Sequence, residues 1–146
     1  MATVLYVDDE AALRRAVHAW LERRGDEVCS ARTIGGAKEQ LAERAFDGVF
    51  IDLWLPDGSG FELFDWIAER DGALAERVAF VTGDIIPSPS TARQLSMLGR
   101  PVLVKPFDLA ELERQVRGWT EARAGAAEQR PLAERGGAGE QPEAPA

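Results

Sequence analysis

The feature that most constrains the fold is the alternation of short β-rich apolar runs with longer segments of helical periodicity. The β-rich runs are residues 3–7 (TVLYV), 27–31 (EVCSA), 47–51 (DGVFI), 77–81 (RVAFV) and 101–104 (PVLV). Strands that alternate with helices favour a parallel sheet that is covered on both faces and joined by right-handed crossovers. The sequence therefore predicts a doubly wound α/β fold with a five-stranded parallel sheet flanked by helices.

The segments between the runs carry helix start and stop signals. Apolar residues recur on one face of residues 11–24, and Gly25 ends that helix. Further helices are predicted over 33–45, 59–70 and 108–119, the second of them capped by Thr33. The segment 83–99 has room only for a short helix, because its two prolines are excluded from a regular helix interior.

The length of 146 residues suits one domain with a core of its own. Beyond Trp119 the chain consists, apart from Thr120, of Ala, Gly, Pro, Glu, Arg and Gln, with Leu132 as its single large apolar residue. Such a segment cannot bury enough surface to offset the entropy of ordering it. We therefore expect a folded domain over residues 1–121 and a disordered tail over 122–146.

Charge and cysteine content exclude several classes of function. The formal net charge of −8 argues against a general affinity for nucleic acid or for an anionic membrane. The single cysteine, Cys29, excludes an internal disulfide and any multi-cysteine metal site. Because the sequence contains no secretory signal or membrane-spanning run, we expect a cytoplasmic location.

Polar residues stand at the ends of four predicted strands, and in an open parallel sheet these ends form one rim where ligands bind. In strand order they are Asp8, Asp9 and Glu10, then Asp52, then Thr82, Gly83 and Asp84, and finally Lys105 with Pro106. Clustered carboxylates repel one another and call for a divalent cation, and oxygen ligands favour Mg²⁺ or Mn²⁺ over zinc.

The remaining groups at the rim suit phosphoryl chemistry. Lys105 and Thr82 are suited to bind the oxygens of an incoming phosphoryl group. Asp52 is then the group that remains to act as the nucleophile. Taken singly, Asp9 reads as a helix cap, Lys105 as a surface lysine and Thr82 as a strand-end hydroxyl. Their coincidence at four strand ends of one sheet favours a common site.

The blocks VLYVDDE, IDLWLPDGSG, FVTGD and VLVKPFD resemble those of the receiver domain of two-component response regulators, over about residues 3–120. The stretch GRPVLVKPFDLAEL is similar to receivers appended to hybrid histidine kinases. The resemblance implies a flavodoxin-like (CheY-like) receiver fold with strand order 2-1-3-4-5, and we expect no output domain in this chain.

The resemblance also implies a role for each residue of the rim. Asp52 would be the phosphoacceptor and also a metal ligand, Asp9 a direct metal ligand and Asp8 a ligand acting largely through water. The backbone carbonyl of Trp54 would complete the metal shell. Thr82 would follow the phosphoryl group on activation, with Lys105 as its ion-pair partner, and the Lys105–Pro106 peptide bond is expected to be cis.

Two residues depart from the usual receiver pattern. Val102 replaces the Tyr or Phe that swings inward on activation, so we expect the switch to run through the segment 83–99, which begins with Gly83 and Asp84. Trp54 places a bulky ring where water must approach Asp52, and we expect it to slow loss of the phosphoryl group.

The resemblance implies a phosphorelay function. A histidine kinase or histidine phosphotransfer protein would donate its phosphoryl group to Asp52 in a Mg²⁺-dependent reaction that the chain itself catalyses, along with slow dephosphorylation. An output protein or a second copy of the domain would be the next partner. One alternative is an aspartyl-nucleophile phosphatase of the haloacid dehalogenase type, although such enzymes carry an acid where this chain has Trp54. The other is a receiver-like module that binds partners without phosphorylation.

Overall fold

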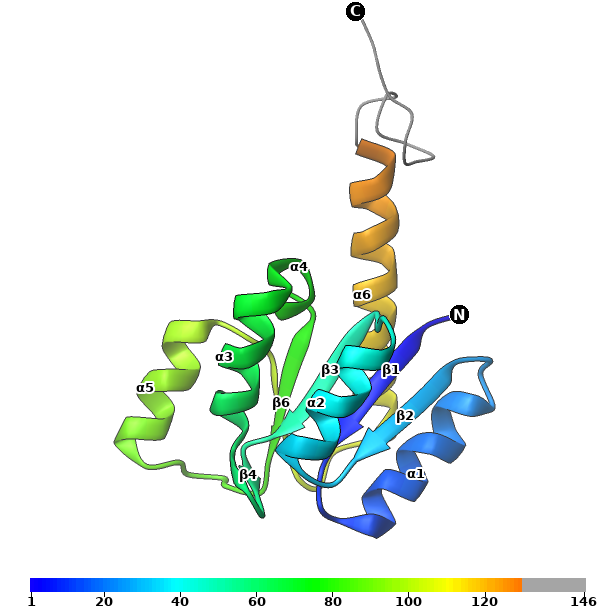
Figure 1. Ribbon diagram of the computed structural model, residues 1–146. Helices are drawn as coiled ribbons and strands as arrows, with labels where there is room; N and C mark the ends of the chain where they lie inside the picture. Colours follow the sequence, from blue (N-terminus) through cyan, green and yellow to red (C-terminus); the bar gives the residue numbers. More distant parts are fainter. Residues whose placement is uncertain (130–146) are drawn as a thin grey trace, which may run out of the picture.

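The computed structural model describes residues 1–129, with the burial of side chains described through residue 122 (Figure 1). Five parallel strands form the central sheet: β1 (Thr3–Val7), β2 (Glu27–Ala31), β3 (Gly48–Asp52), β6 (Val78–Thr82) and β7 (Val102–Val104). Their order in space is β2-β1-β3-β6-β7, which is the predicted order 2-1-3-4-5 when only the strands of this sheet are counted. The predicted doubly wound fold is confirmed.

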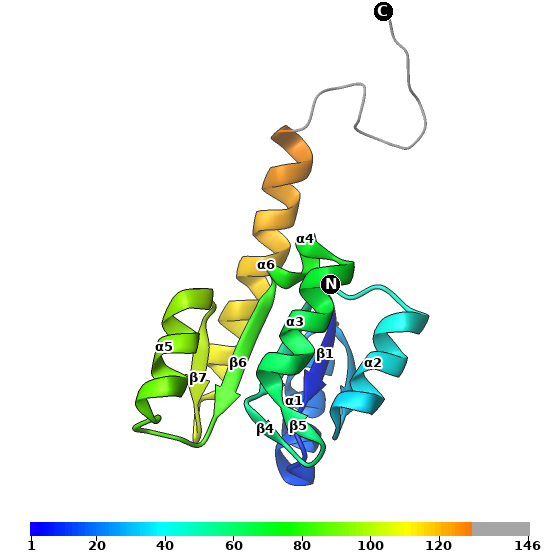
Figure 2. The same ribbon diagram turned by 60° about the vertical axis from the view of Figure 1, so that its left-hand side comes forward.

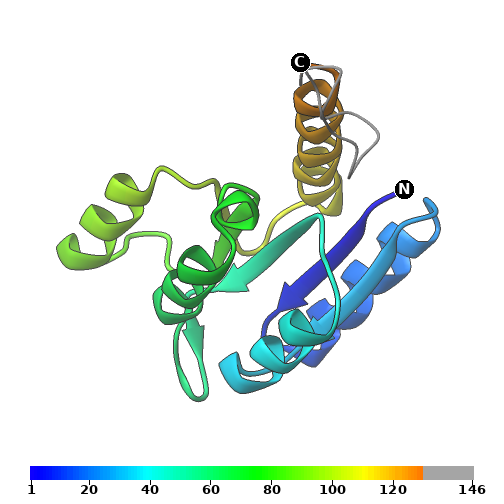
Figure 3. The ribbon, with the colours of Figure 1, turned by 45° about the horizontal axis from the view of Figure 1, so that its top comes forward.

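Helices cover both faces of the sheet (Figure 3). On one face, α1 (Ala11–Glu22) and α6 (Leu109–Gln129) pack against the apolar cluster that includes Val4 and Tyr6 of β1. On the other face, α2 (Ile34–Glu43), α3 (Gly60–Arg70) and α5 (Pro89–Leu98) pack against the cluster that includes Leu5 and Val7. The alternation within β1 is that of a strand buried on both faces.

The residues predicted to begin or end helices lie at the helix ends. Thr33 caps α2 by accepting a hydrogen bond from the Gly36 amide at 3.0 Å. Gly25 follows α1 with a positive φ of 88°, which glycine adopts without steric cost. The segment 83–99 holds a helix of ten residues, α5, with Pro89 in its first turn, where the missing N–H costs no hydrogen bond.

Some elements differ from the expectation. An antiparallel ribbon of β4 (Trp54–Leu55) and β5 (Gly58–Ser59) and a short helix, α4 (Gly72–Ala75), were not predicted. The third and fourth strands of the sheet also end one residue later than expected. Parallel pairing continues through Asp52, opposite Val81, and through Thr82, opposite Val104. Both polar residues are therefore held in the sheet itself.

The last helix, α6, continues to Gln129 and projects past the end of the sheet at which the strands begin (Figure 2). Residues 122–129 thus differ from the expectation of disorder from residue 122. Apart from Gly125 they are Ala, Glu, Arg and Gln residues, whose high helix propensity favours continuation of the helix. Residues 130–146, the rest of the expected tail, lie outside the described residues. Within the described part of the chain, no helix combines the length and the apolar character needed to cross a membrane.

A close contact fixes α6 to the sheet. The ring of Trp119, which is 5% exposed, packs on Phe50 with ring centroids 4.8 Å apart. The same ring fills the space next to Gly48, where an added Cβ would overlap it. Glycine at position 48 is therefore a steric requirement for seating Trp119 against β3.

We predict that Gly48→Ala lowers the free energy of unfolding by about 1–3 kcal/mol, because overpacking displaces the Trp119 ring. Gly118→Ala is the matched control, since a Cβ added at position 118 meets no neighbouring atom within 4 Å. The substitution also replaces a glycine inside a helix by alanine. It should raise the stability by about 0.5–1 kcal/mol. Urea unfolding of both variants measures the difference, and a Gly48→Ala variant as stable as the wild type would contradict this packing.

Candidate functional site

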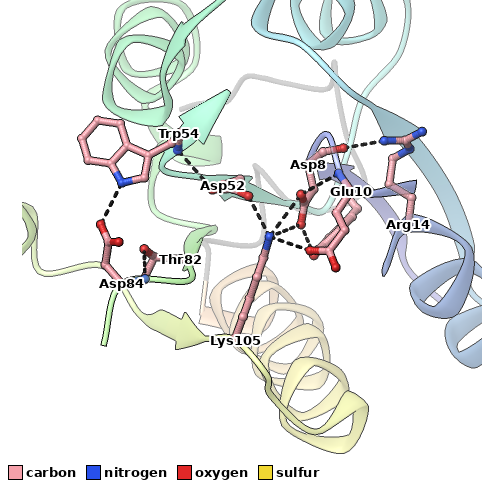
Figure 4. A network of polar contacts seen from close by, with 9 residues as sticks. Asp8, Glu10, Arg14, Asp52, Trp54, Thr82, Asp84 and Lys105 are labelled. Atoms are coloured by element: carbon pink, nitrogen blue, oxygen red, sulfur yellow. Dashed lines mark hydrogen bonds and ion pairs between the residues drawn. The ribbon is translucent and has the colours of Figure 1, made fainter. Parts of the chain in front are cut away.

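Figure 4 shows the rim of the sheet, where Lys105 reaches from the loop after β7 toward carboxylates at the carboxyl ends of β1 and β3. Its Nζ lies 2.9 Å from Oδ2 of Asp52, 3.1 Å from Oδ2 of Asp8 and 3.1 Å from Oε1 of Glu10. Asp52 ends β3, whereas Asp8 and Glu10 follow β1. A single ammonium group thus contacts three carboxylates from two segments that are distant in the sequence.

Asp8 is the most enclosed acid of the rim, with a side chain that is 0% exposed. The hydroxyl of Tyr6 donates to its Oδ2 at 2.8 Å, and the Glu10 amide donates to its Oδ1 at 3.0 Å. Burial and the negative charge of Asp8 raise the pKa of Tyr6, so its hydroxyl stays protonated and remains a donor. These donors and Lys105 together satisfy a carboxylate that would otherwise be costly to bury.

Asp52 is held by the chain on both sides. Its Oδ1 accepts a hydrogen bond from the Trp54 amide at 3.1 Å. Gly60 begins α3 directly beside it, and an added Cβ at position 60 would overlap the Asp52 carbonyl oxygen. The amide of Gly60 also donates to the carbonyl of Leu53 at 2.7 Å. The carboxylate therefore projects from a backbone that has little freedom to move.

The two central charges shift each other's pKa. Burial raises the pKa of the Asp52 carboxyl, and the charge of Asp8 raises it further; hydrogen bonds from Lys105 and from the Trp54 amide offset this only in part. Burial would lower the pKa of Lys105, but its hydrogen bonds to Asp52 and Asp8 outweigh this effect and raise it. Lys105 is therefore charged at neutral pH, and the rim holds more negative charge than this ammonium balances.

The acidic residues lie close enough to share a cation. Carboxylate oxygens of Asp8, Asp9 and Asp52 all lie within 4.8 Å of one another. Asp8 and Asp52 are buried and Asp9 is exposed, so the group is open to solvent on the side of Asp9. Oxygen-only ligands with an excess of negative charge fit Mg²⁺ or Mn²⁺. The three aspartates among the predicted metal ligands thus lie close together, and the metal site itself stays a prediction.

The other predicted residues lie beside this cluster. Thr82 is 2% exposed, and its Oγ1 accepts a hydrogen bond from the Asp84 amide at 3.0 Å. Among the described residues, the Thr82 hydroxyl makes no hydrogen bond with the side chain of Asp52 or of Lys105. Trp54 is 48% exposed, and its indole lies toward Asp84 rather than toward Lys105 (Figure 4). The Lys105–Pro106 peptide bond is cis. Val102 is half-buried against the core on the α5 side.

Two contacts of the site were missed in the sequence. Tyr6 stands two residues before Asp8, so the two-residue period of a strand turns both side chains to the same side, and this signal was available. Arg14, one turn into α1, donates from Nη1 to the carbonyl oxygen of Asp8 at 2.8 Å. Nothing in the periodicity of α1 distinguishes Arg14 from the exposed arginines near it.

A family model described as the response regulator receiver domain matches residues 4–117. Response regulator protein PilR of Pseudomonas aeruginosa is 36% identical over 129 residues, which are 88% of this chain and 28% of PilR. Swarming motility regulation protein RssB of Serratia marcescens is 33% identical, over 86% of this chain and 56% of RssB. The chain belongs to the receiver domain family of two-component response regulators.

The chain spans between about a quarter and just over half of the length of these two relatives. A region of the sensor histidine kinase AruS of Pseudomonas aeruginosa is also 31% identical, over 76% of this chain and 11% of AruS. Both kinds of protein therefore carry similar domains, and the assignment to hybrid-kinase receivers stays a prediction. Among solved structures, the beryllofluoride-activated NtrC4 receiver domain dimer is similar with a TM-score of 0.73 and 30% identity, covering 84% of this chain and 98% of that chain.

We predict that Lys105→Met lowers the free energy of unfolding at pH 7 by about 1–3 kcal/mol, because it leaves buried carboxylates without their counter-charge. The pKa of Asp52 is already raised and rises further in the variant. The variant's deficit should therefore shrink as the pH falls and Asp52 becomes protonated. Chemical denaturation at several pH values measures this.

Lys38→Met is the matched control, because Lys38 lies in α2 at 5.6 Å from the centroid of the Trp66 ring and contacts no acid of the rim. It should change the stability by about 0.5 kcal/mol or less at every pH. A Lys105→Met variant with the stability and pH dependence of the control would contradict the role assigned to the ammonium.

Proposed function

We propose that this domain is a phosphoacceptor and that Asp52 accepts a phosphoryl group from a phosphohistidine of a histidine kinase or a histidine phosphotransfer protein. The observation that supports this most is the convergence of Asp52, Asp8, Asp9 and Lys105 at the rim. A carboxylate that is fixed by its backbone and flanked by one cation suits nucleophilic attack on phosphorus.

In the proposed transfer, a carboxylate oxygen of Asp52 forms the new O–P bond while the N–P bond of the phosphohistidine breaks. The leaving imidazole nitrogen retains the bonding electron pair, and the product on Asp52 is an acyl phosphate. Lys105 pairs with an oxygen of the transferred group, and the hydroxyl of Thr82 donates to another. The domain thus catalyses its own phosphorylation and, through attack by water, a slow dephosphorylation.

The metal expected at this site is Mg²⁺, with Mn²⁺ as a substitute. Asp9 and Asp52 would hold it directly, together with the backbone carbonyl of Trp54, and Asp8 would act through water. When bound, the cation neutralises charge on the phosphoryl oxygens. Asp9, the exposed member of the group, stands on the open side by which a cation enters.

The switch proposed for this chain runs through residues 83–99. Valine at position 102 has one stiff torsion and too little bulk to vacate a pocket as an aromatic ring does. The stretch between Thr82 and α5 is less constrained, because Ile85 and Ile86 are 79% and 90% exposed. Movement of Thr82 toward the phosphoryl group would therefore displace Gly83, Asp84 and the residues after them.

The proposed partners follow from the family. Receiver domains interact with histidine kinases and with output domains, and an output protein or a second copy of this chain is the candidate for the phosphorylated state. The similar NtrC4 receiver domain is a dimer when it is activated by beryllofluoride, a mimic of a phosphoryl group. We propose a cytoplasmic location, where phosphodonors and Mg²⁺ are available.

We predict that incubation with acetyl phosphate and Mg²⁺ adds one phosphoryl group to the protein and that Asp52→Asn abolishes the addition. Intact-protein mass spectrometry measures the mass increase. Removal of Mg²⁺ by a chelator should also prevent it, because the carboxylates of the rim repel the phosphodonor.

Asp57→Asn is the matched control, since Asp57 is an aspartate of the neighbouring ribbon turn whose carboxylate caps α2 through the amides of Ile34 and Gly35. It should be phosphorylated as the wild type is. Unchanged modification of Asp52→Asn would reject the acceptor. Partner binding by an unmodified wild type would instead favour a module that works without phosphorylation.

A further inference from the structure

Two hydrogen bonds in series connect Trp54 to the hydroxyl of Thr82 through Asp84 (Figure 4). The indole Nε1 of Trp54 donates to Oδ2 of Asp84 at 2.9 Å. The backbone N–H of Asp84 donates to Oγ1 of Thr82 at 3.0 Å. Asp84 is therefore held at its side chain and at its backbone, and its N–H contacts the hydroxyl oxygen of Thr82.

The two ends of this connection differ in how firmly the chain holds them. Trp54 lies in β4, is paired with Ser59, and donates its own amide to Asp52. Asp84 instead precedes a stretch without regular structure, in which Ile85 and Ile86 are largely exposed. The indole is thus the fixed partner, and its hydrogen bond ties a weakly packed segment to the ribbon beside Asp52.

We propose that the Trp54–Asp84 hydrogen bond is a latch that holds the Thr82 hydroxyl in its position away from Asp52 in the unphosphorylated domain. The inference rests on the proposed function, in which this hydroxyl must reach a phosphoryl group on Asp52. For that movement Thr82 and Asp84 must shift together or separate from each other. The latch opposes the joint shift, because it anchors Asp84 to a residue that stays in place.

The latch lowers the fraction of molecules in the arrangement that accepts a phosphoryl group. Loss of one solvent-accessible hydrogen bond shifts such an equilibrium about five-fold. When the competent arrangement is the minor one, the rate of phosphorylation rises by the same factor. This role belongs to the indole N–H alone and is separate from the predicted shielding of Asp52 from water, which would depend on the ring.

Three variants distinguish the effect of the indole N–H from the effects of the aromatic ring and of the Asp84 charge. Trp54→Phe keeps a ring and removes the donor. Asp84→Leu removes the acceptor, whereas Asp84→Asn removes the charge and keeps an acceptor oxygen. The double variant Trp54→Phe/Asp84→Leu should behave as either single variant does, since both changes break the same bond.

The first measurement is hydrogen exchange by NMR at the amide of residue 84, without metal or phosphodonor. After correction for intrinsic rates, we expect exchange about five-fold faster in Trp54→Phe and Asp84→Leu, and close to wild type in Asp84→Asn. Unchanged exchange in the first two variants would overturn the proposal. Fast exchange in Asp84→Asn would also overturn it, because the charge and not the hydrogen bond would then be responsible.

The second measurement is the rate of phosphorylation by acetyl phosphate with Mg²⁺. We expect it to rise by up to about five-fold in the two variants that break the latch. Faster exchange without a faster rate would show a purely structural contact and overturn the proposal. A wild type that accepts no phosphoryl group would reject the proposed function, whereas the exchange experiment tests the latch by itself.

Discussion

The ammonium of Lys105 is the interaction on which the arrangement of the site depends. It contacts Asp52 at 2.9 Å and Asp8 at 3.1 Å, and neither carboxylate is accessible enough for water to take over this role. Without the ammonium the two acids would repel each other across a poorly solvated space, and one of them would become neutral. With the ammonium present, both carboxylates remain hydrogen-bond acceptors at one point of the rim.

The pairing of strands in the sheet, and not local structure around Lys105, places its ammonium at the site. Lys105 follows β7, the edge strand, whereas Asp8 follows β1 and Asp52 ends β3. The amide of Lys105 donates to the carbonyl of Thr82 at 2.7 Å, so the parallel ladder with β6 sets the height of the lysine on the rim. Gly60 lets α3 approach the backbone of Asp52, which fixes the other side. The parallel sheet thus converts four distant sequence positions into one site with an excess of negative charge.

The order of strands and helices and the residues that gather at the rim could be predicted from the sequence, because both depend on patterns within short segments. The strands are dense β-rich runs, and polar residues such as Asp52 and Thr82 interrupt them at the rim. The ribbon of β4 and β5 was missed, since strands of two residues show no periodicity. The extension of α6 was missed because its sequence carries no apolar periodicity, although its residues other than Gly125 favour helix.

The contact between Trp54 and Asp84 was beyond the reach of sequence patterns for another reason. Its two residues were both singled out, yet 30 positions separate them and each lies in a connection between strands of the central sheet. Whether an indole turns toward a carboxylate there depends on rotamers and loop paths, which no periodic pattern specifies. The same is true of Arg14, whose contact is with a backbone carbonyl oxygen.

The most direct test of the account is the titration of the Asp52 side chain, followed by the chemical shift of its carboxyl carbon in NMR. The central claim is that Asp52 lies in a buried cluster with more negative charge than Lys105 balances and with room for a cation. The account predicts a pKa above the ordinary value of about 3.9 without metal, and a lower pKa when Mg²⁺ is added. An ordinary or lowered pKa that Mg²⁺ does not change would contradict it.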